Sequence, residues 1–511
     1  MALQATGAVD LSLGNGFASA SATAVGVAFN NNLPLLAITT NQHRAAAYPH
    51  SGMFMDMDTK AVLAPLTKWN AVVHDARRMP ELVRTAFREA LGGRPGPVHL
   101  DIPQDVLISS CHFADDEFDP APSRYRASHS ARPAADAIGQ AVHLLRAAKR
   151  PLVVAGGGVV SSHAAGAVRT LAAMLQAPVV PTQMALGVVP TDSPHFIGHG
   201  GLIAGDAVRA AFEQADVIVS IGCRWSSWMW DERGALARRS HRVISINIDP
   251  SALGHPVMHE VGMLADASLA LADLNAALNE AGTFQVDAQW LPHIRAVRAQ
   301  YDAKLAEMAR DTEDTMHPAA LASAVAQAMP TDALAVYDGG HTTFWSNDFT
   351  PVKDVRTRFH EPGMSHLGFG LPYALALKLQ YPARAVLNIT GLNADIFVGS
   401  GGLGGGVSSG FGPQAVIRPA LNNARPRPIV SLWVEGFMGS SMRSFVGEGG
   451  ASGRALQMYC VLFWAQATIG ILVQRAEHLR QGRIDGCFVL ADRAIRVLVE
   501  LLERARCAGG L

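Results

Sequence analysis

Short apolar runs alternate with helical segments along most of this chain, and this alternation constrains the fold more than any other feature. The runs "LPLLAIT" (33–39) and "GPVHLDIP" (96–103) are bounded by turn residues, as buried strands usually are. Between them, "RMPELVRTAFREAL" (78–91) places Leu, Val and Phe at helical spacing. Strands that alternate with helices are typical of parallel sheets, so residues 1–115 are predicted to form an α/β domain.

The same alternation occurs in two further blocks. A polar stretch with several prolines (115–133) is predicted to be a linker. The segment 135–280 then contains four strand-like runs and is predicted to be a Rossmann-like unit: "RPLVVAGGG", "APVVPT", "ADVIVSIGCR" and "HRVISINIDP". After a charged helical connector (289–312), a third block (313–511) begins with "DALAVYDGGHTTF" and "ARAVLNITG".

Composition narrows the class of protein. A length of 511 residues suggests about three domains, and a net charge of −1 gives no reason to expect nucleic acid or an anionic membrane as partner. The five cysteines include no CxxC pair, the N-terminus does not resemble a signal peptide, and "YCVLFWAQATIGILV" is too short to span a bilayer. These features predict a soluble cytoplasmic protein, and three α/β blocks favour an enzyme over a scaffold.

Several strings occur in the order found in one known family. In the third block, "VYDGGHTTFW" and "EPGMSHLGFGLPYALALKLQYPARAVLNITG" resemble the diphosphate-binding domain of thiamine-diphosphate enzymes of the acetolactate synthase and benzoylformate decarboxylase type. In the first block, "GNGFASASATAVGVAFNNNLPLLAIT" is similar to the GPG segment of that family, and "LTKWN" and "GRPGPVHLDIPQDV" resemble its later strings. The central block resembles it through "RPLVVAGGG" and "ISINIDP". The similarity covers roughly residues 10 to 391.

The resemblance implies an architecture and an activity. The chain is expected to contain three parallel-sheet α/β domains: a truncated pyrimidine-binding domain (1–115), a Rossmann-like central domain (135–280) and a diphosphate-binding domain (313–511) that is irregular from about residue 392. The implied activity is decarboxylation of a 2-oxo acid, with transfer of the remaining carbon unit to a proton or a second carbonyl, and the cofactor acts as the electron sink. Because the family places its cofactor between subunits, a homodimer or homotetramer is implied.

Glycines in the third block suit a phosphate site. Glycine lets backbone amides approach a diphosphate without interference from a Cβ atom, although the same glycines are also compatible with tight turns alone. They lie at positions 339, 340, 368 and 370. The resemblance assigns diphosphate or cofactor contacts to Gly340, His341, Thr342, Met364, His366, Leu367 and Gly391.

The expected metal motif is altered. The family motif begins Gly-Asp-Gly and its aspartate binds Mg²⁺, but this chain has Gly391, Leu392 and Asn393. Leucine cannot coordinate a hard cation, so the candidate oxygen ligands are Asn393, Asp395 and Glu435, the last of which lies 44 residues beyond Gly391. The extra length falls in "VGSGGLGGGVSSGFGPQ", which is either an insertion or the product of a disturbed reading frame. Its GxGxxG is not followed by a helix-forming sequence and is interpreted as a chance match.

The activating glutamate of the family has no counterpart before the GPG-like segment. The first glutamate is Glu81, within the predicted helix at 78–91, where it is expected to be a solvated surface residue. Two hypotheses follow. The chain is either a working thiamine enzyme with altered metal ligands, or a non-catalytic relative or disrupted gene product that retains the fold without the cofactor chemistry.

The resemblance also assigns a substrate pocket and raises the question of a flavin. His50, Phe54 and Lys68 lie where the family lines its pocket, with packing or surface roles as the alternative. His199 lies where the acetolactate synthase branch approaches FAD. However, Arg224 is followed by Trp-Ser-Ser where that branch has an acidic pair, which argues against flavin binding.

Overall fold

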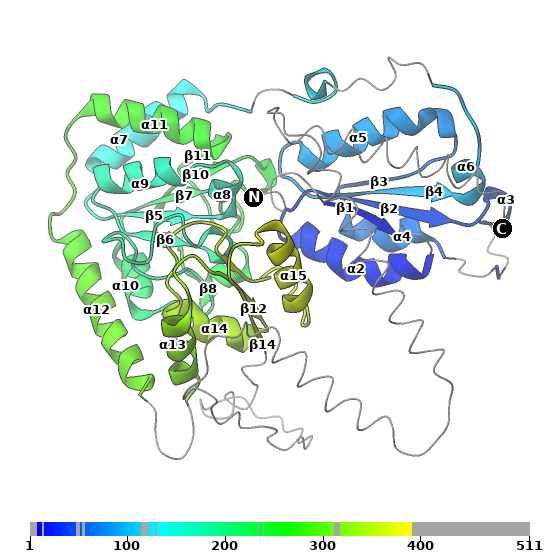
Figure 1. Cartoon of the computed structure of the whole chain (residues 1–511). Helices are drawn as coiled ribbons and strands as arrows, with labels where there is room; N and C mark the ends of the chain where they lie inside the picture. Colours follow the sequence, from blue (N-terminus) through cyan, green and yellow to red (C-terminus); the bar gives the residue numbers. More distant parts are fainter. Residues whose placement is uncertain are drawn as a thin grey trace, which may run out of the picture. The chain divides into compact units, whose positions relative to one another are not determined.

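Three parallel sheets, one in each block, make up the described part of the chain (Figure 1). The computed structural model describes residues 8–12, 15–47, 52–53, 57–113, 121–127, 130–231, 234–238, 240–310 and 317–390. Each sheet has helices between its strands, as the alternation in the sequence predicts. The α/β fold class is therefore confirmed.

The first block contains a four-stranded parallel sheet in the order β1-β2-β4-β3. Its strands are β1 (Ala8–Ser12), β2 (Leu35–Asn41), β3 (Trp69–Val72) and β4 (Pro97–Pro103). Its helices are α2 (Asn15–Asn30), α3 (Arg44–Ala47), α4 (Thr59–Leu63), α5 (Met79–Leu91) and α6 (Gln104–Leu107).

Helices cover both faces of this sheet, which explains why all seven residues of β4 are buried. On one face, Leu82 and Ala86 of α5 pack against Leu100 of β4. On the other face, Val25 of α2 and Leu63 of α4 pack in a separate cluster. Because buried parallel strands need no polar face, they appear in the sequence as nearly continuous apolar runs.

The central block contains a five-stranded parallel sheet in the order β11-β10-β7-β5-β6. Its strands are β5 (Pro151–Ala155), β6 (Val179–Pro181), β7 (Val217–Ile221), β10 (Arg242–Asn247) and β11 (Val261–Leu264), with a short antiparallel pair, β8 (Trp230–Asp231) and β9 (Gly234–Ala235). Its helices are α7 (Ala135–Ala147), α8 (Gly157–Ser161), α9 (Ala165–Met174), α10 (Asp206–Gln214) and α11 (Ala267–Ala281), followed by α12 (Trp290–Met308).

Helices flank the central sheet on both faces (Figure 1), and a cluster of buried apolar side chains lies on each face. Val153 and Val219 lie in a cluster with residues of α7, α9 and α11, whereas Leu152 and Ile218 lie in a cluster with residues of α10 and α12. Successive strand residues point to opposite faces, so each strand contributes to both layers. The order of the strands reverses between β5 and β7, and such a switch point is where open α/β sheets usually bind ligands.

The third block contains a three-stranded parallel sheet in the order β13-β12-β14. Its elements are α13 (Pro318–Ala328), β12 (Leu334–Asp338), α14 (Gly340–Phe349), β13 (Arg358–Phe359), α15 (Gly370–Gln380) and β14 (Val386–Thr390). Phe369 and Leu377 pack against Leu334 and Val336 of β12. All three strands point the same way, so their carboxyl ends meet at one edge of the sheet.

The observed elements agree closely with those predicted from the sequence, and α12 accounts for the helical connector at 289–312. The sequence analysis does not predict strands β1, β3, β11 and β13. Strand β3, within the string "LTKWN" and the residues after it, is short and has no fully buried residue. The domain limits remain predictions. None of the helices in the described part of the chain is long and apolar enough to cross a bilayer. Neither Cys111 nor Cys223, the two cysteines that the structure describes, forms a disulfide.

Candidate functional site

Two glycine-containing loops lie at the carboxyl edge of the third sheet. Strand β12 ends at Asp338 and is followed by Gly339, whose φ of +95° favours glycine, before α14 begins at Gly340. Strand β13 ends at Phe359, and residues 360–369 lead from it to the start of α15. Both helices therefore begin at the edge where a parallel sheet usually binds its ligand.

Asp338 joins the two loops. Its carboxylate accepts hydrogen bonds from the backbone N–H of Gly368 at 3.1 and 3.0 Å and from that of Gly370 at 3.0 Å. The residue is only 5% exposed, and Gly368 has a φ of +92°. The end of β12 thus holds the start of α15 in a defined position.

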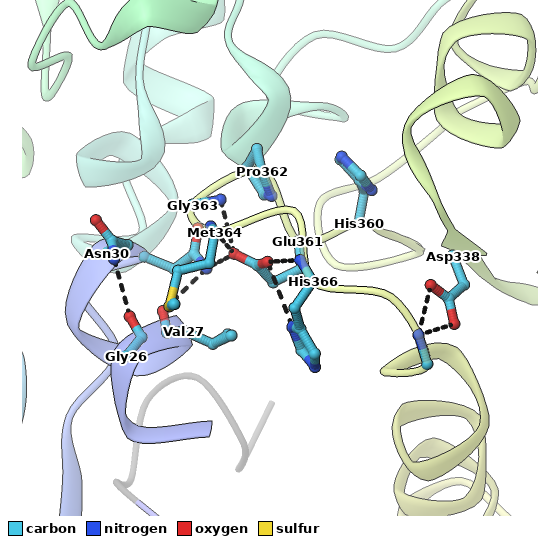
Figure 2. Close-up of polar contacts among 12 residues, drawn as sticks. Gly26, Val27, Asn30, Asp338, His360, Glu361, Pro362, Gly363, Met364 and His366 are labelled. Carbon is cyan, nitrogen blue, oxygen red and sulfur yellow. Dashed lines mark hydrogen bonds and ion pairs between the residues drawn. The ribbon is translucent and has the colours of Figure 1, made fainter. Parts of the chain in front are cut away.

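Glu361 organises the other part of the second loop (Figure 2). Its Oε1 accepts hydrogen bonds from the backbone N–H of Gly363 at 2.7 Å and of Met364 at 2.9 Å, and its Oε2 accepts one from His366 N–H at 3.3 Å. The side-chain amide of Asn31, at the end of α2, donates a fourth at 2.7 Å. Burial raises the pKa of Glu361, but these hydrogen bonds outweigh it and hold the pKa below its ordinary value.

His360 is a neutral histidine beside this loop. Its Nδ1 lies 2.7 Å from Thr343 Oγ1 and 3.2 Å from the carbonyl oxygen of Tyr337, whereas its buried Nε2 has no hydrogen-bond partner among the described residues. Burial and then the charge of Arg358 lower the pKa of His360 to about 4. At neutral pH the ring is therefore uncharged and contributes no positive charge to the loop.

The structure brings six of the predicted cofactor residues into these two loops. Gly340, His341 and Thr342 form the first turn of α14, and Met364, His366 and Leu367 lie on the second loop. His341 packs against Phe344, and His366 Nδ1 lies 3.6 Å from Glu361 Oε2. The assigned roles of these residues remain predictions.

The remaining predicted residues lie elsewhere or outside the described part. Gly391, Asn393, Asp395, Glu435, His50 and Phe54 belong to segments that the structure does not describe. Lys68 donates hydrogen bonds to the carbonyl oxygens of Glu89 and Gly92 at the end of α5. A role for Lys68 in a substrate pocket therefore stays a prediction, and its ammonium already has these backbone partners.

The shape of the two loops suits the diphosphate that the resemblance implies. A Cβ atom added at Gly368 would meet nothing within 4 Å, and one added at Gly340 would meet only Phe344, at 3.9 Å. Helix α14 follows a glycine and has no side-chain cap, and the N-terminus of a helix favours a bound anion. Within the described ranges, no group of three or more His, Cys, Asp or Glu side chains could hold a metal.

A second candidate site lies at the switch point of the central sheet. A cavity of about 1090 Å³ is lined there by turn residues that follow β5 and β7, including Gly156, Gly222 and Arg224, and also by Gln183 and Trp228. Its volume is sufficient for a nucleotide-sized ligand.

His199 lies behind the wall of this cavity. The side chain is 1% exposed, and its Nδ1 lies 3.4 Å from the side-chain nitrogen of Gln183. Its Nε2 lies 3.6 Å from Asp348 Oδ1. The argument from the sequence against flavin binding remains a prediction.

Sequence reasoning did not single out Asp338 or Glu361 as site residues. Asp338 is the last residue of β12 and precedes Gly339, whereas Glu361 lies two residues after β13 and two residues before Gly363. Glycines so close to the end of a strand are a local signal of a turn at the carboxyl edge of a sheet. Their partners, however, are backbone amides up to 32 residues away and the side chain of Asn31, 330 residues away. No local pattern predicts such partners.

Comparisons with known proteins agree with the geometry. Residues 138–274 match the model described as "Thiamine pyrophosphate enzyme, central domain", and residues 338–392 match "Thiamine pyrophosphate enzyme, C-terminal TPP binding domain". The acetolactate synthase isozyme 1 large subunit of Escherichia coli is 30% identical over 371 residues, which cover 72% of this chain and 62% of that protein.

Other relatives carry similar names. The probable acetolactate synthase large subunit of Methanocaldococcus jannaschii is 29% identical over 380 residues, covering 72% of this chain and 62% of that protein. The acetolactate synthase large subunit of Lactococcus lactis is 27% identical over 425 residues, which cover 82% of this chain and 70% of that protein. The matched part of the chain spans 62% of the length of the Escherichia coli and Methanocaldococcus jannaschii proteins.

Proposed function

Because the chain belongs to the thiamine-diphosphate-dependent enzyme family, we propose that it is an acetolactate synthase-like enzyme that acts on 2-oxo acids. The proposed reaction removes CO₂ from the substrate and transfers the remaining carbon unit to a proton or to a second carbonyl compound. The observation that carries this proposal is the pair of glycine loops at the carboxyl edge of the third sheet, joined by Asp338.

The first turn of α14 would hold the diphosphate of the cofactor. Backbone amides of Gly340, His341 and Thr342 lie at the positive end of that helix, and an anion is stabilised there. Met364, His366 and Leu367 on the second loop would support the rest of the cofactor. When bound, thiamine diphosphate supplies an electron sink for the carbanion that decarboxylation creates.

The protein's own contribution is to orient these loops before the cofactor binds. Asp338 and Glu361 are both buried, and both accept backbone N–H groups of the second loop. His360 is uncharged, so it does not compete with these backbone N–H groups for the carboxylates as a cation would. Mg²⁺ would require oxygen ligands, and we propose Asn393, Asp395 or Glu435 for this role.

One observation favours a non-catalytic relative as the second candidate. In the described part of the first block, the glutamates are Glu81 and Glu89, and both lie on α5 beside arginines. The side chain of Glu81 is 56% exposed and pairs with Arg78, which confirms that Glu81 is a solvated surface residue. Neither glutamate therefore has the setting of a carboxylate that activates a cofactor.

Titration separates the two candidates. Purified protein would be titrated with thiamine diphosphate in the presence of Mg²⁺, with binding followed by calorimetry and CO₂ release measured with pyruvate and longer 2-oxo acids. Saturable binding with CO₂ release supports the proposed enzyme. Binding without turnover, or no binding at millimolar cofactor, contradicts the proposed enzyme and supports the non-catalytic relative.

The partners of the proposed enzyme follow from the family. They are a small 2-oxo acid and further copies of the same chain, as a homodimer or homotetramer, and the proposed location is the cytoplasm. Nucleic acid and membrane partners are not part of the proposal.

A further inference from the structure

We propose that Glu361 is a positioning residue that holds the loop 363–367 in one conformation, so that the loop is ordered before any cofactor binds. The functional consequence rests on the function proposed above, because this loop carries the predicted cofactor contacts Met364, His366 and Leu367. The order of the loop is a property of the protein alone, so it is tested without the cofactor.

The hydrogen bonds of Glu361 define the path of the loop. Three backbone N–H groups, from Gly363, Met364 and His366, converge on one carboxylate within 3.3 Å. Figure 2 shows these groups arranged around the side chain, which comes from the start of the same loop. A flexible loop rarely directs three amides at one point, so the carboxylate selects a single conformation.

Burial makes this arrangement specific for a carboxylate. Glu361 is 2% exposed, and a buried charge is stable only when it is paired or fully hydrogen-bonded. Oε1 accepts three hydrogen bonds and Oε2 accepts one, so four donors hold this carboxylate within the loop. Its role is therefore to position the loop.

The loop is also fitted closely against helix α2 of the first block. A Cβ atom on Gly363 would lie 2.7 Å from Asn30 Cβ and 2.9 Å from Glu361 Oε1. A Cβ atom on Gly26 would lie 2.6 Å from the sulfur of Met364. Because both glycines are needed for this approach, a displaced loop would have to leave the surface of α2.

Two further contacts limit the movement of the loop at its ends. The indole N–H of Trp228 donates a hydrogen bond to the carbonyl oxygen of Pro362 at 2.7 Å. At the other end, Asp338 accepts the N–H of Gly368. Met364 and Leu367 lie between these ends and are 44% and 75% exposed, so the fixed loop presents apolar side chains outward. An ordered loop of this kind binds a ligand without a further loss of conformational entropy.

Hydrogen–deuterium exchange of the cofactor-free protein tests the proposal directly. We expect Glu361→Ala to increase the exchange of the Gly363, Met364 and His366 amides by about tenfold or more, because their shared acceptor is lost. Glu361→Gln retains Oε1 but replaces Oε2 with a donor, so it should accelerate His366 alone. Glu260→Ala, which removes an exposed carboxylate paired with Arg242, is the matched control and should leave the loop unchanged.

Unchanged exchange at all three amides in a folded Glu361→Ala protein would overturn the proposal. If that variant does not fold, the comparison between wild type and Glu361→Gln decides: equal exchange at His366 overturns it, and selective acceleration supports it. Peptides covering 360–370, with fragmentation to resolve single amides, provide the measurement.

Cofactor titration of the same proteins tests the functional consequence. We expect Glu361→Ala to bind thiamine diphosphate about tenfold more weakly, and Glu361→Gln to recover most of the affinity, while thermal unfolding of the first and central blocks stays unchanged. If wild type does not bind the cofactor, the proposed function fails while the exchange data still decide the role of Glu361. If wild type and Glu361→Ala bind equally well, the positioning role fails and the proposed function remains.

Discussion

His99 lies on β4 with no exposed surface, and its Nε2 is 2.7 Å from Thr39 Oγ1. The hydroxyl of Thr39 donates its hydrogen to Asp101 at 2.7 Å, so it must accept a hydrogen bond from the Nε2–H of His99. The Nδ1 of His99 is then unprotonated and has no hydrogen-bond partner among the described residues. Burial lowers the pKa of His99 to about 4, although the charge of Asp101 acts in the opposite direction.

This histidine should make the first sheet sensitive to acid. An unfolded chain protonates His99 near pH 6.5 and the folded chain only near pH 4, so its stabilising effect is complete above pH 6.5 and decreases as the pH falls toward 4. Between pH 7 and 5 we expect wild type to lose about 2 kcal/mol more stability than His99→Gln, which does not titrate. Hydrogen exchange of the amides in β2 and β4 measures the difference.

A second histidine provides the control. His143 is exposed on α7 in the central block, and His143→Gln should leave the acid response of the first sheet as it is in wild type. Equal pH dependence in wild type and His99→Gln would show that His99 does not set this response.

At the scale of the element, the start of α15 depends on one glycine. Gly370 donates its N–H to Asp338 Oδ2, and a Cβ atom at this position would overlap Asn388 Oδ1 and lie 2.7 Å from Asp338 Cβ. The helix therefore begins where β12 and β14 approach it most closely. Phe369 and Leu377 then pack it onto the sheet, so a shift at Gly370 would disturb the whole element.

A pair of glycine substitutions tests this dependence. Gly370→Ala should destabilise the third block by about 1–3 kcal/mol because it forces Asp338 and Asn388 apart. Gly139→Ala, within α7, should stabilise the central block by about 0.5–1 kcal/mol, because no atom lies within 4 Å of its new Cβ and alanine favours a helix. Thermal unfolding of both variants is the measurement, and a neutral Gly370→Ala would contradict the proposed close approach.

At the scale of the whole molecule, each block has its own buried apolar clusters, and the contacts between the blocks include hydrogen bonds and ion pairs. Asn31 joins the first block to Glu361 in the third, and Arg94 pairs with Asp249 in the central block at 3.0 Å. The outer face of α15 contributes to none of these contacts. It presents Leu371, Leu375 and Leu379 at helical spacing, each 55% to 57% exposed.

We propose this leucine face as the contact surface of the homodimer or homotetramer proposed above, because three aligned and exposed leucines form an apolar surface of the kind that interfaces bury. Wild type should then have at least twice the mass of one 54.1 kDa chain in light scattering. Leu375→Glu with Leu379→Glu should shift it toward the mass of one chain, because burial of each leucine stabilises an interface by about 1.5–3 kcal/mol. Ile108→Glu, at an exposed apolar position of the first block, is the control. A double variant with the mass of wild type would exclude this face as the interface.

The sequence alone determined the class of fold and where the two glycine loops of the candidate site lie in the chain. Buried parallel strands such as β4 and β5 are apolar on both faces, and helices such as α5 have an apolar side, so both are recognisable from local periodicity. Glycines at 339, 340, 368 and 370 indicated the loops because their backbone requirements are also local.

Only the tertiary structure decided which carboxylates and histidines are buried and which groups they form hydrogen bonds with. Glu361 acquires its role from Asn31 and from amides that fold back toward it, Asp338 from Gly368 and Gly370, and His99 from Thr39 on a neighbouring strand. The state of a buried polar group depends on which donors surround it and on how far water is excluded. Both conditions arise from residues distant in the chain, so no local pattern in the sequence can specify them.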